Sequence, residues 1–240
     1  MKASRSSASR HRGILSAALA LSLLTVAGCV NVTTGPQASL PPLPPLVTAG
    51  AEHYTIRSEG SDVRFLVYRA GPLAAFGHNH VIHAATLQGD VYLNRQFSLS
   101  GFSITLPVKA FRVDEPAERA AEGADFAVQP SAAAVSGTSS NMFGPALLDA
   151  AHFPEIVVRS VRISGPQSDP VVTVRITLHG IQRELDVPIT LATSGSQLMV
   201  SCSFDVKQTD FGIAPFSILG GGLQVADTVK VHLRIVAERD

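Results

Sequence analysis

The segment Gln197-Leu-Met-Val-Ser-Cys-Ser-Phe-Asp-Val-Lys207 decides the expected fold of this chain. Apolar residues from Leu198 to Val206 occupy every second position, and mostly polar residues occupy the positions between them. Successive side chains of a β-strand point to opposite faces of a sheet. The segment therefore predicts a strand with one apolar face and one face exposed to solvent.

The same two-residue period recurs along the chain. It is clear in residues 63–67, 102–108, 172–178, 185–191 and 229–235, although Leu66 interrupts the first of these runs. Weaker runs at 53–58, 84–93 and 155–163 bring the number of expected strands to eight or nine. One-sided burial over so many strands favours antiparallel neighbours in a closed or stacked sheet. The sequence thus predicts an all-β fold, a single antiparallel β-barrel of about eight strands.

Residues 111–153 break this rhythm, because they are rich in Ala and do not alternate. Within them, residues 116–126 and 141–151 are each expected to form a short helix, and Pro154 is expected to end the second. Turn signals at 59–61, 179–180 and 194–196 separate the flanking strands and suit short connections. We interpret residues 111–153 as a helical insertion in the barrel and not as a second domain.

Residues 1–28 have the pattern of an export signal. Basic residues, beginning with Lys2, precede the apolar stretch 14–26, which is too short to span a bilayer. This stretch runs into Val26-Ala27-Gly28-Cys29, which resembles a bacterial lipobox, where the Cys is lipidated and becomes the new N-terminus. The alternative is an ordinary signal peptide followed by a coincidental Cys.

On the lipobox interpretation, the lipidated Cys29 attaches the protein to a membrane without a transmembrane helix. Residues 29–51 are rich in Pro and are expected to form an extended tether, which leaves residues 52–240 as the folded domain. Val30, and not Asp, follows Cys29, and by resemblance to enterobacterial sorting this favours the outer membrane. We therefore expect a lipoprotein of the cell envelope that faces the periplasm.

The composition excludes several classes of protein. Lys and Arg number 19 and Asp and Glu also number 19, and this balance argues against a nucleic-acid-binding protein. Two Cys residues are too few for a disulfide framework or a Cys-rich zinc site. Cys202 lies on the apolar side of its strand and is expected to be a buried hydrophobe and not a nucleophile. No catalytic motif stands out, so we expect a protein that is not an enzyme.

Four segments of the sequence carry a family resemblance. They are the opening strands Tyr54–Val67 with Gly89-Asp-Val91, the junction Leu148-Asp-Ala-Ala-His-Phe-Pro154, the hairpin Thr173–Pro188, and the loop Gln208-Thr-Asp-Phe-Gly-Ile213. In this order they resemble the YceI-like family of lipid- or polyisoprenoid-binding proteins, over about residues 52–238. The resemblance implies a lipocalin-like barrel that encloses an isoprenoid chain. The chain departs from the family pattern at Ile181-Gln182-Arg183 and in a longer region at 111–140.

The interior of an eight-stranded barrel has room for side chains or for one apolar ligand. Alternation alone leaves open whether the inward face is a packed core or the wall of a binding cavity. Together with the resemblance, it favours binding of an isoprenoid-like or other amphiphilic lipid, a quinone-like lipid included. The residues expected to line the cavity are Phe65, Val67, Phe102, Ile104, Leu106, Val174, Ile176, Leu185, Val187, Val200 and Phe204. The sequence does not indicate an oligomeric state.

The segment Phe76-Gly-His-Asn-His80 suggests an alternative function. On a strand, His78 and His80 would face the same side and offer two imidazoles to a transition metal, if a third ligand came from elsewhere. His83 has the wrong parity to join them unless a bulge intervenes. The alternative is a metal-binding or redox-associated envelope protein. Two further interpretations of the histidines stay open, a polar contact at the mouth of a pocket and a structural loop at the barrel rim.

Overall fold

The computed structural model describes residues 40–240. The predicted signal peptide 1–28, Cys29 and residues 30–39 of the predicted tether lie outside the described residues. Twelve strands form one sheet: β1 (Ala51–Ala70), β2 (His80–Ala84), β3 (Gln88–Asn94), β4 (Gly101–Pro107), β5 (Phe111–Val113), β6 (Glu155–Ser164), β7 (Val171–Leu178), β8 (Ile181–Pro188), β9 (Thr190–Ser194), β10 (Gln197–Lys207), β11 (Ser217–Ile218) and β12 (Leu223–Arg239). The two α-helices are α1 (Pro116–Ala121) and α2 (Ala132–Phe143).

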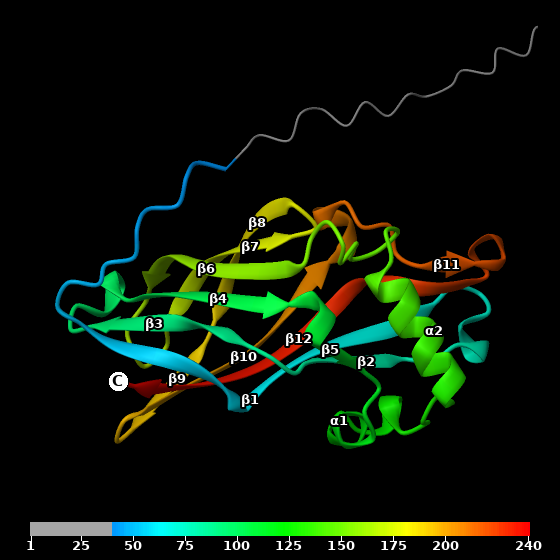
Figure 1. Cartoon of the computed structure of the whole chain (residues 1–240), viewed down its shortest axis with the longest axis horizontal. Helices are drawn as coiled ribbons and strands as arrows, with labels where there is room; N and C mark the ends of the chain where they lie inside the picture. The colour runs from blue at the N-terminus through cyan, green and yellow to red at the C-terminus, as the bar shows by residue number, and fades with distance from the viewer. Residues whose placement is uncertain (1–39) are drawn as a thin grey trace, which may run out of the picture. The chain divides into compact units, whose positions relative to one another are not determined.

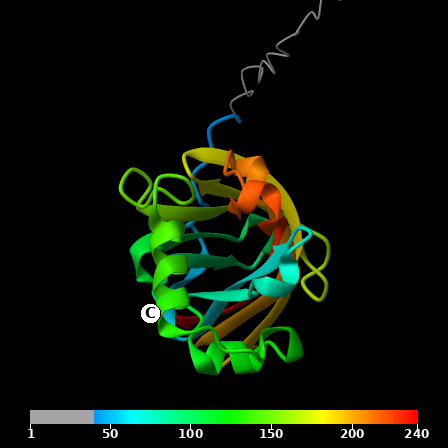
Figure 2. The same ribbon diagram turned by 90° about the vertical axis from the view of Figure 1, so that its right-hand side faces the viewer.

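The strands pair antiparallel in the order β8-β7-β6-β4-β3-β1-β12-β10-β9, and the short strands β2, β5 and β11 attach to the side of this path. The first and last strands of the path, β8 and β9, are neighbours in the sequence with only Ile189 between them. The N–H of Ile189 still donates to the carbonyl of Pro170 beside β7, while β9 already pairs with β10. The chain thus turns a corner from one edge of the sheet to the other, and the sheet curls around its interior (Figure 1, Figure 2).

The predicted fold class, an all-β antiparallel lipocalin-like barrel with a short helical insertion, is confirmed. The turn expected at residues 59–61 is wrong. Residues 51–70 form one strand, and the pairing register with β12 shifts between Arg57 and Asp62. Both halves of β1 pair with the same neighbour, so Gly60, with a φ of +80°, accommodates a bulge and not a reversal of the chain.

The helices of the insertion only partly match the sequence prediction. Helix α1 begins at residue 116 as expected, but the second helix is residues 132–143 and not 141–151. The Ser131 side chain accepts a hydrogen bond from the N–H of Ala134 and caps the start of α2, while Gly144 and Pro145 end it. Both helices lie at the same end of the curled sheet, opposite the C-terminus (Figure 1), and α2 stands in front of one side of that end (Figure 2).

The insertion explains why Leu66 breaks the alternation of β1. Leu66 and Val81 are almost fully buried on the outer side of β1 and β2, where they form a small cluster with Phe126. Tyr68 packs against this cluster, and its ring meets the Phe126 ring edge-on at 5.4 Å. Both faces of β1 are therefore apolar at this point, because the insertion covers the outer face.

Residues 40–46, Leu-Pro-Pro-Leu-Pro-Pro-Leu, lie along the outside of the sheet. Leu40, Leu43 and Leu46 are half-buried and recur every third residue, which is the period of a polyproline II helix. The carbonyl of Pro41 accepts a 2.6 Å hydrogen bond from Arg175 on β7, and Arg159 on β6 bonds the carbonyl of Pro44. This part of the predicted tether is therefore attached to the domain.

Arg175 is only 4% exposed, and its guanidinium donates a hydrogen bond to the carboxylate of Glu184 on β8. This carboxylate compensates the buried positive charge of Arg175. We expect Arg175→Met to release residues 40–46 and to lower the free energy of unfolding by about 1–3 kcal/mol, because Glu184 and the Pro41 carbonyl lose their donor. Urea unfolding checks the stability, and limited proteolysis checks the release. The matched control is Arg162→Met, since Arg162 is a largely exposed arginine on β6. Equal effects of the two substitutions would contradict the role of Arg175 in attaching residues 40–46 to the sheet.

Candidate functional site

The curled sheet encloses an apolar cavity, called cavity 1 here, with a volume of about 150 Å³. Its wall is formed by the inward faces of most strands of the path, from β1 around to β12. The wall side chains are almost all Val, Ile, Leu and Phe, with only small polar groups at Ser100 and Cys202. Nothing in this wall can hold a charge, so cavity 1 suits a hydrocarbon chain.

A second cavity, cavity 2, has a volume of about 210 Å³ and lies at the end of the sheet where α2 packs. Apolar residues such as Val67, Ile82 and Met142 form most of its wall. It also contains five polar side chains, His80, Thr138, Asn141, Lys207 and Gln208. Asn141 and Lys207 are exposed, whereas His80 is half-buried, so the polar groups extend from the surface inward.

The two cavities share five wall residues, which we call the constriction. Phe65, Ile156, Leu178, Val206 and Phe211 line both cavities. Phe211 is almost fully buried and comes from the loop Gln208–Ile213, where Gly212 adopts a φ of +71° to end the turn. A long ligand that occupied both cavities would therefore pass the side chains of Phe65, from β1, and Phe211, from this loop.

Ten of the eleven residues predicted from the sequence to line a cavity do so. Val67 lines cavity 2, Phe65 lies at the constriction, and the others line cavity 1. Leu185 lines neither cavity, although it packs against the apolar core, and it borders a separate polar pocket of about 430 Å³ between β8 and β10. This polar pocket lies where β8 and β10 do not pair.

The sequence prediction missed other parts of the wall. Ile156, Ile163, Val231 and Ile235 line cavity 1 from alternating runs that the sequence did show. The α2 residues of cavity 2, such as Met142, have no such signal, because the helix reaches the barrel end only through tertiary packing.

His78 and His80 do not form the metal site that the spacing suggested. Strand β2 begins at His80, so His78 lies in the preceding loop, where the rule that residues i and i+2 share a face does not apply. His78 is exposed, and its ring centroid is 6.4 Å from that of His80. The parity argument for His83 is correct, since it lies on the outer face while His80 and Ile82 line cavity 2.

His80 is instead paired with a buried carboxylate. Its Nδ1 lies 2.6 Å from Oδ2 of Asp114, which is 2% exposed. The other oxygen of Asp114 accepts hydrogen bonds from the N–H of Val81 and from Arg119, which is also buried. Burial alone would raise the pKa of Asp114, but the hydrogen bonds from His80, Val81 and Arg119 lower this pKa below its ordinary value. Asp114 is therefore an ionised acceptor that fixes the imidazole.

The model of the YceI-like domain family matches residues 54–237. The chain belongs to the YceI-like family. Two of the segments that carry the family resemblance touch in the structure, because the ring of Phe153 packs 4.7 Å from that of His179 and covers Gly180, whose φ is +73°.

Solved structures with the same fold have low sequence identity to this YceI-like chain. BcnA of Burkholderia cenocepacia is 16% identical, with a TM-score of 0.56, and the match covers 75% of this chain and 98% of that one. A polyisoprenoid binding domain from Saccharophagus degradans is 13% identical, with a TM-score of 0.52, and the match covers 78% and 98%. A search of curated proteins gave no match.

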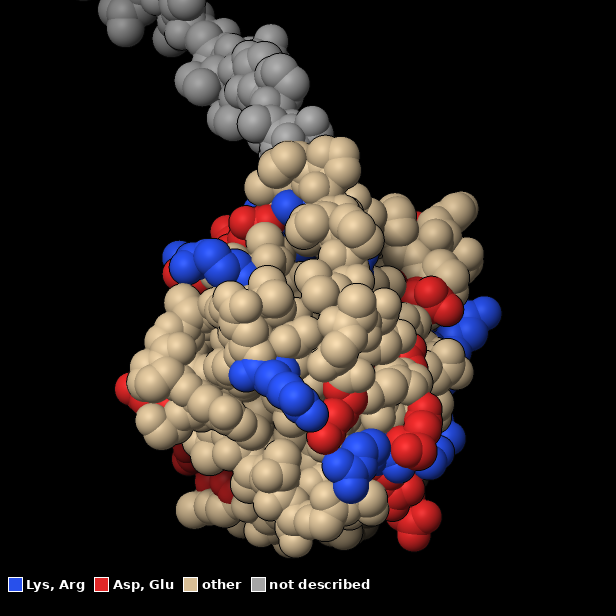
Figure 3. Space-filling view, turned by 90° about the vertical axis from the view of Figure 1, so that its left-hand side faces the viewer, with Lys and Arg blue, Asp and Glu red and all other residues tan. Residues whose placement is uncertain are grey.

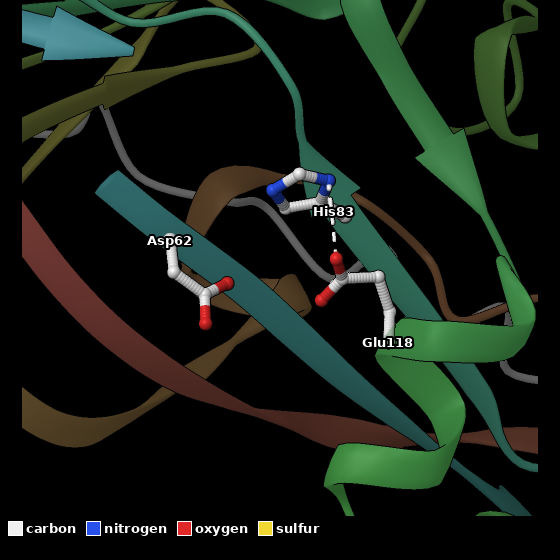
Figure 4. A group of neighbouring side chains, drawn as sticks. All are labelled: Asp62, His83 and Glu118. Carbon is white, nitrogen blue, oxygen red and sulfur yellow. Dashed lines mark ion pairs between the residues drawn. The ribbon is translucent and has the colours of Figure 1, made fainter. Parts of the chain in front are cut away.

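A second polar cluster lies outside the YceI-like barrel, where α1 packs on β1 and β2. Asp62, His83 and Glu118 offer one ligand atom each within 4.8 Å of one another, the only such group of metal-ligand type within residues 40–240 (Figure 4). Arg64, however, forms ion pairs with Asp62, Glu118 and Glu122, at 3.3 Å for Glu118 and 2.9 Å for Glu122. The carboxylates are thus already compensated, and the cluster attaches α1 to the sheet.

The end of the YceI-like domain opposite α2 carries few charged side chains. On the face drawn in Figure 3, Lys and Arg are mixed with Asp and Glu, and most of the surface is neither. This face has no basic patch of the kind that binds nucleic acid. Within the described part of the chain, no helix is both long and apolar enough to cross a membrane.

Cys202 provides a chemical reporter of cavity 1. Its side chain lines the cavity, and burial raises the pKa of the thiol to about 11. Only the thiolate reacts with alkylating agents, and a free Cys has a pKa of about 8.5. The interior position therefore makes the thiol inert near neutral pH, as the strand pattern predicted.

We expect N-ethylmaleimide at pH 8 to modify Cys202 at least about 100-fold more slowly in the native protein than in urea, because the native thiolate fraction is far smaller. The native rate should rise about tenfold per pH unit up to pH 10. Peptide mapping by mass spectrometry isolates the signal of Cys202 from that of Cys29. Equal native and denatured rates would show that Cys202 is exposed to solvent.

Proposed function

We propose that this YceI-like protein binds one isoprenoid-like or other amphiphilic lipid in cavities 1 and 2, without catalysis. The observation that carries the proposal is the pair of apolar cavities that meet at the constriction inside the curled sheet. Burial of hydrocarbon contributes about 25 cal/mol per Å², so a chain of isoprene units can bind without a charged contact. The structural relative from Saccharophagus degradans, described as a polyisoprenoid binding domain, supports the same ligand class.

The proposed location is the cell envelope, facing the periplasm, with attachment to the outer membrane through a lipidated Cys29. This part of the proposal rests on the sequence pattern of residues 1–29. Residues 40–46, which follow the proposed anchor in the sequence, contact Arg159 and Arg175 on the outer face of β6 and β7.

The metal-binding alternative finds no support in the geometry of the described residues. His78 and His80 do not converge, and His80 uses Nδ1 to bond Asp114. The group formed by Asp62, His83 and Glu118 contains neither of them.

The first test is native mass spectrometry of the full chain, produced in a host that exports it to the envelope, with organic extraction and metal analysis of the same sample. We expect a long-chain apolar molecule at about one per protein. A sample that carries no lipid, and that takes up none when prenols are added, would contradict the proposal.

The second test fills cavity 1. We expect Val200→Phe to weaken binding of a prenyl lipid about tenfold, because a loss of roughly 60 Å² of buried ligand surface costs about 1.4 kcal/mol. The matched control is Ser203→Phe, which adds the same ring on the same strand at an exposed position. Titration with geranylgeraniol measures both dissociation constants. If Ser203→Phe weakens binding as much as Val200→Phe, the ligand does not occupy cavity 1.

A further inference from the structure

The interior of the barrel is apolar except at one place, the wall of cavity 2 that contains His80. Cavity 1 offers no charged or strongly polar side chain, whereas cavity 2 combines His80 with Thr138, Asn141, Lys207 and Gln208. The two cavities share the residues of the constriction, so a ligand that spans both would have an apolar part in cavity 1 and a polar part beside His80 in cavity 2. An amphiphile fits this asymmetry in one orientation, with its tail in cavity 1.

His80 is held rigidly, because Asp114 receives its Nδ1–H and is itself fixed by Val81 and Arg119. Arg119 also donates to the carbonyl of Asn79, directly before His80, and to the carbonyl of Val128 in the insertion. Because Nδ1 is bonded to Asp114, Nε2 is the ring nitrogen that remains on the other edge of the imidazole. Among the described residues, this Nε2 has no hydrogen-bond partner, and the ring lines cavity 2.

We propose that Nε2 of His80 binds a hydroxyl group on the head of the lipid, whose prenyl-type tail passes the constriction into cavity 1. This inference rests on the proposed function and adds the chemistry of the head group and the orientation of the ligand. Asp114 acts as a positioning residue, because it holds the imidazole without touching the ligand.

A hydroxyl is the head group that suits this nitrogen best. When the imidazole is neutral and its proton is on Nδ1, Nε2 is an acceptor and needs a donor from the ligand. When the imidazole is protonated, Nε2 donates, and a hydroxyl oxygen can accept. An ether or a carbonyl oxygen meets only the second condition.

The rest of cavity 2 argues against an anionic head group. Lys207 is the only basic side chain in its wall apart from His80, and it is exposed at the mouth. Gln208 already donates its amide N–H to the carbonyl of Ala226. A phosphate or pyrophosphate needs several donors or cations around it, as bidentate arginines provide elsewhere. The polar wall thus matches a neutral alcohol, such as a prenol or a quinol.

The experiment compares geranylgeraniol with its methyl ether, in competition for the purified full chain, with native mass spectrometry as the readout. We expect the wild type to prefer the alcohol about fivefold, the usual effect of one net hydrogen bond. His80→Phe should abolish this preference, so that the alcohol and the ether bind with equal affinity. The matched control His78→Phe, at the exposed neighbouring histidine, should keep the preference.

The outcomes separate this inference from the proposed function. Equal binding of alcohol and ether by the wild type, or a preference that survives in His80→Phe, overturns the role of His80 while lipid binding itself stands. Binding of neither compound overturns the proposed function and this inference with it. Should His80→Phe fail to fold, His80→Leu replaces it, and the alcohol-to-ether ratio remains the deciding quantity, because a purely structural role would not change that ratio.

Discussion

A single residue, Ile189, joins the two edge strands of the hydrogen-bonded path, and the architecture of the domain depends on this connection. Because β8 pairs with β7 and β9 pairs with β10, a sheet that stayed open would place the two strands far apart. The link of one residue is possible only if the sheet curls until its edges meet. The curl encloses the apolar faces of the strands, and it leaves a gap further along, where β8 and β10 are unpaired and a polar pocket forms.

Within this enclosure, apolar side chains face one another across the interior without filling it. The two cavities lie in series along the barrel and share the constriction around Phe65 and Phe211. Their asymmetry comes from the insertion, which brings α2 to one end and places Asp114 behind His80. Asp114 has a φ of +56°, an unusual conformation that Asp tolerates better than most residues, and the buried pair with Arg119 holds it there. The insertion therefore adds polar side chains at one end of an interior that is otherwise apolar.

The strand pattern made most of the cavity wall predictable. Residues such as Ile104, Val174 and Val200 alternate with polar neighbours, and one inward face per strand follows directly from the pleat of the backbone. Leu185 points toward the core as its pattern predicts but lines neither cavity, because the pattern gives the direction of a side chain and not the shape of the space beside it. Leu66 broke the pattern because the insertion covers the outside of β1, and local sequence cannot show what covers a face. His78 and His80 were grouped by a strand rule that fails where the strand begins only at His80.

The sequence by itself determined the all-β class, the family, the apolar parity of the strands and the place of the insertion in the chain. These properties follow from local periodicity and from short motifs, which act over a few residues. Only the tertiary structure decided that the interior holds two cavities, that residues 40–46 lie against Arg159 and Arg175, and that His80 pairs with Asp114 while its ring lines a cavity. Each of these depends on groups far apart in the sequence, such as His80 and Asp114, which are 34 residues apart and meet because β5 pairs with β2.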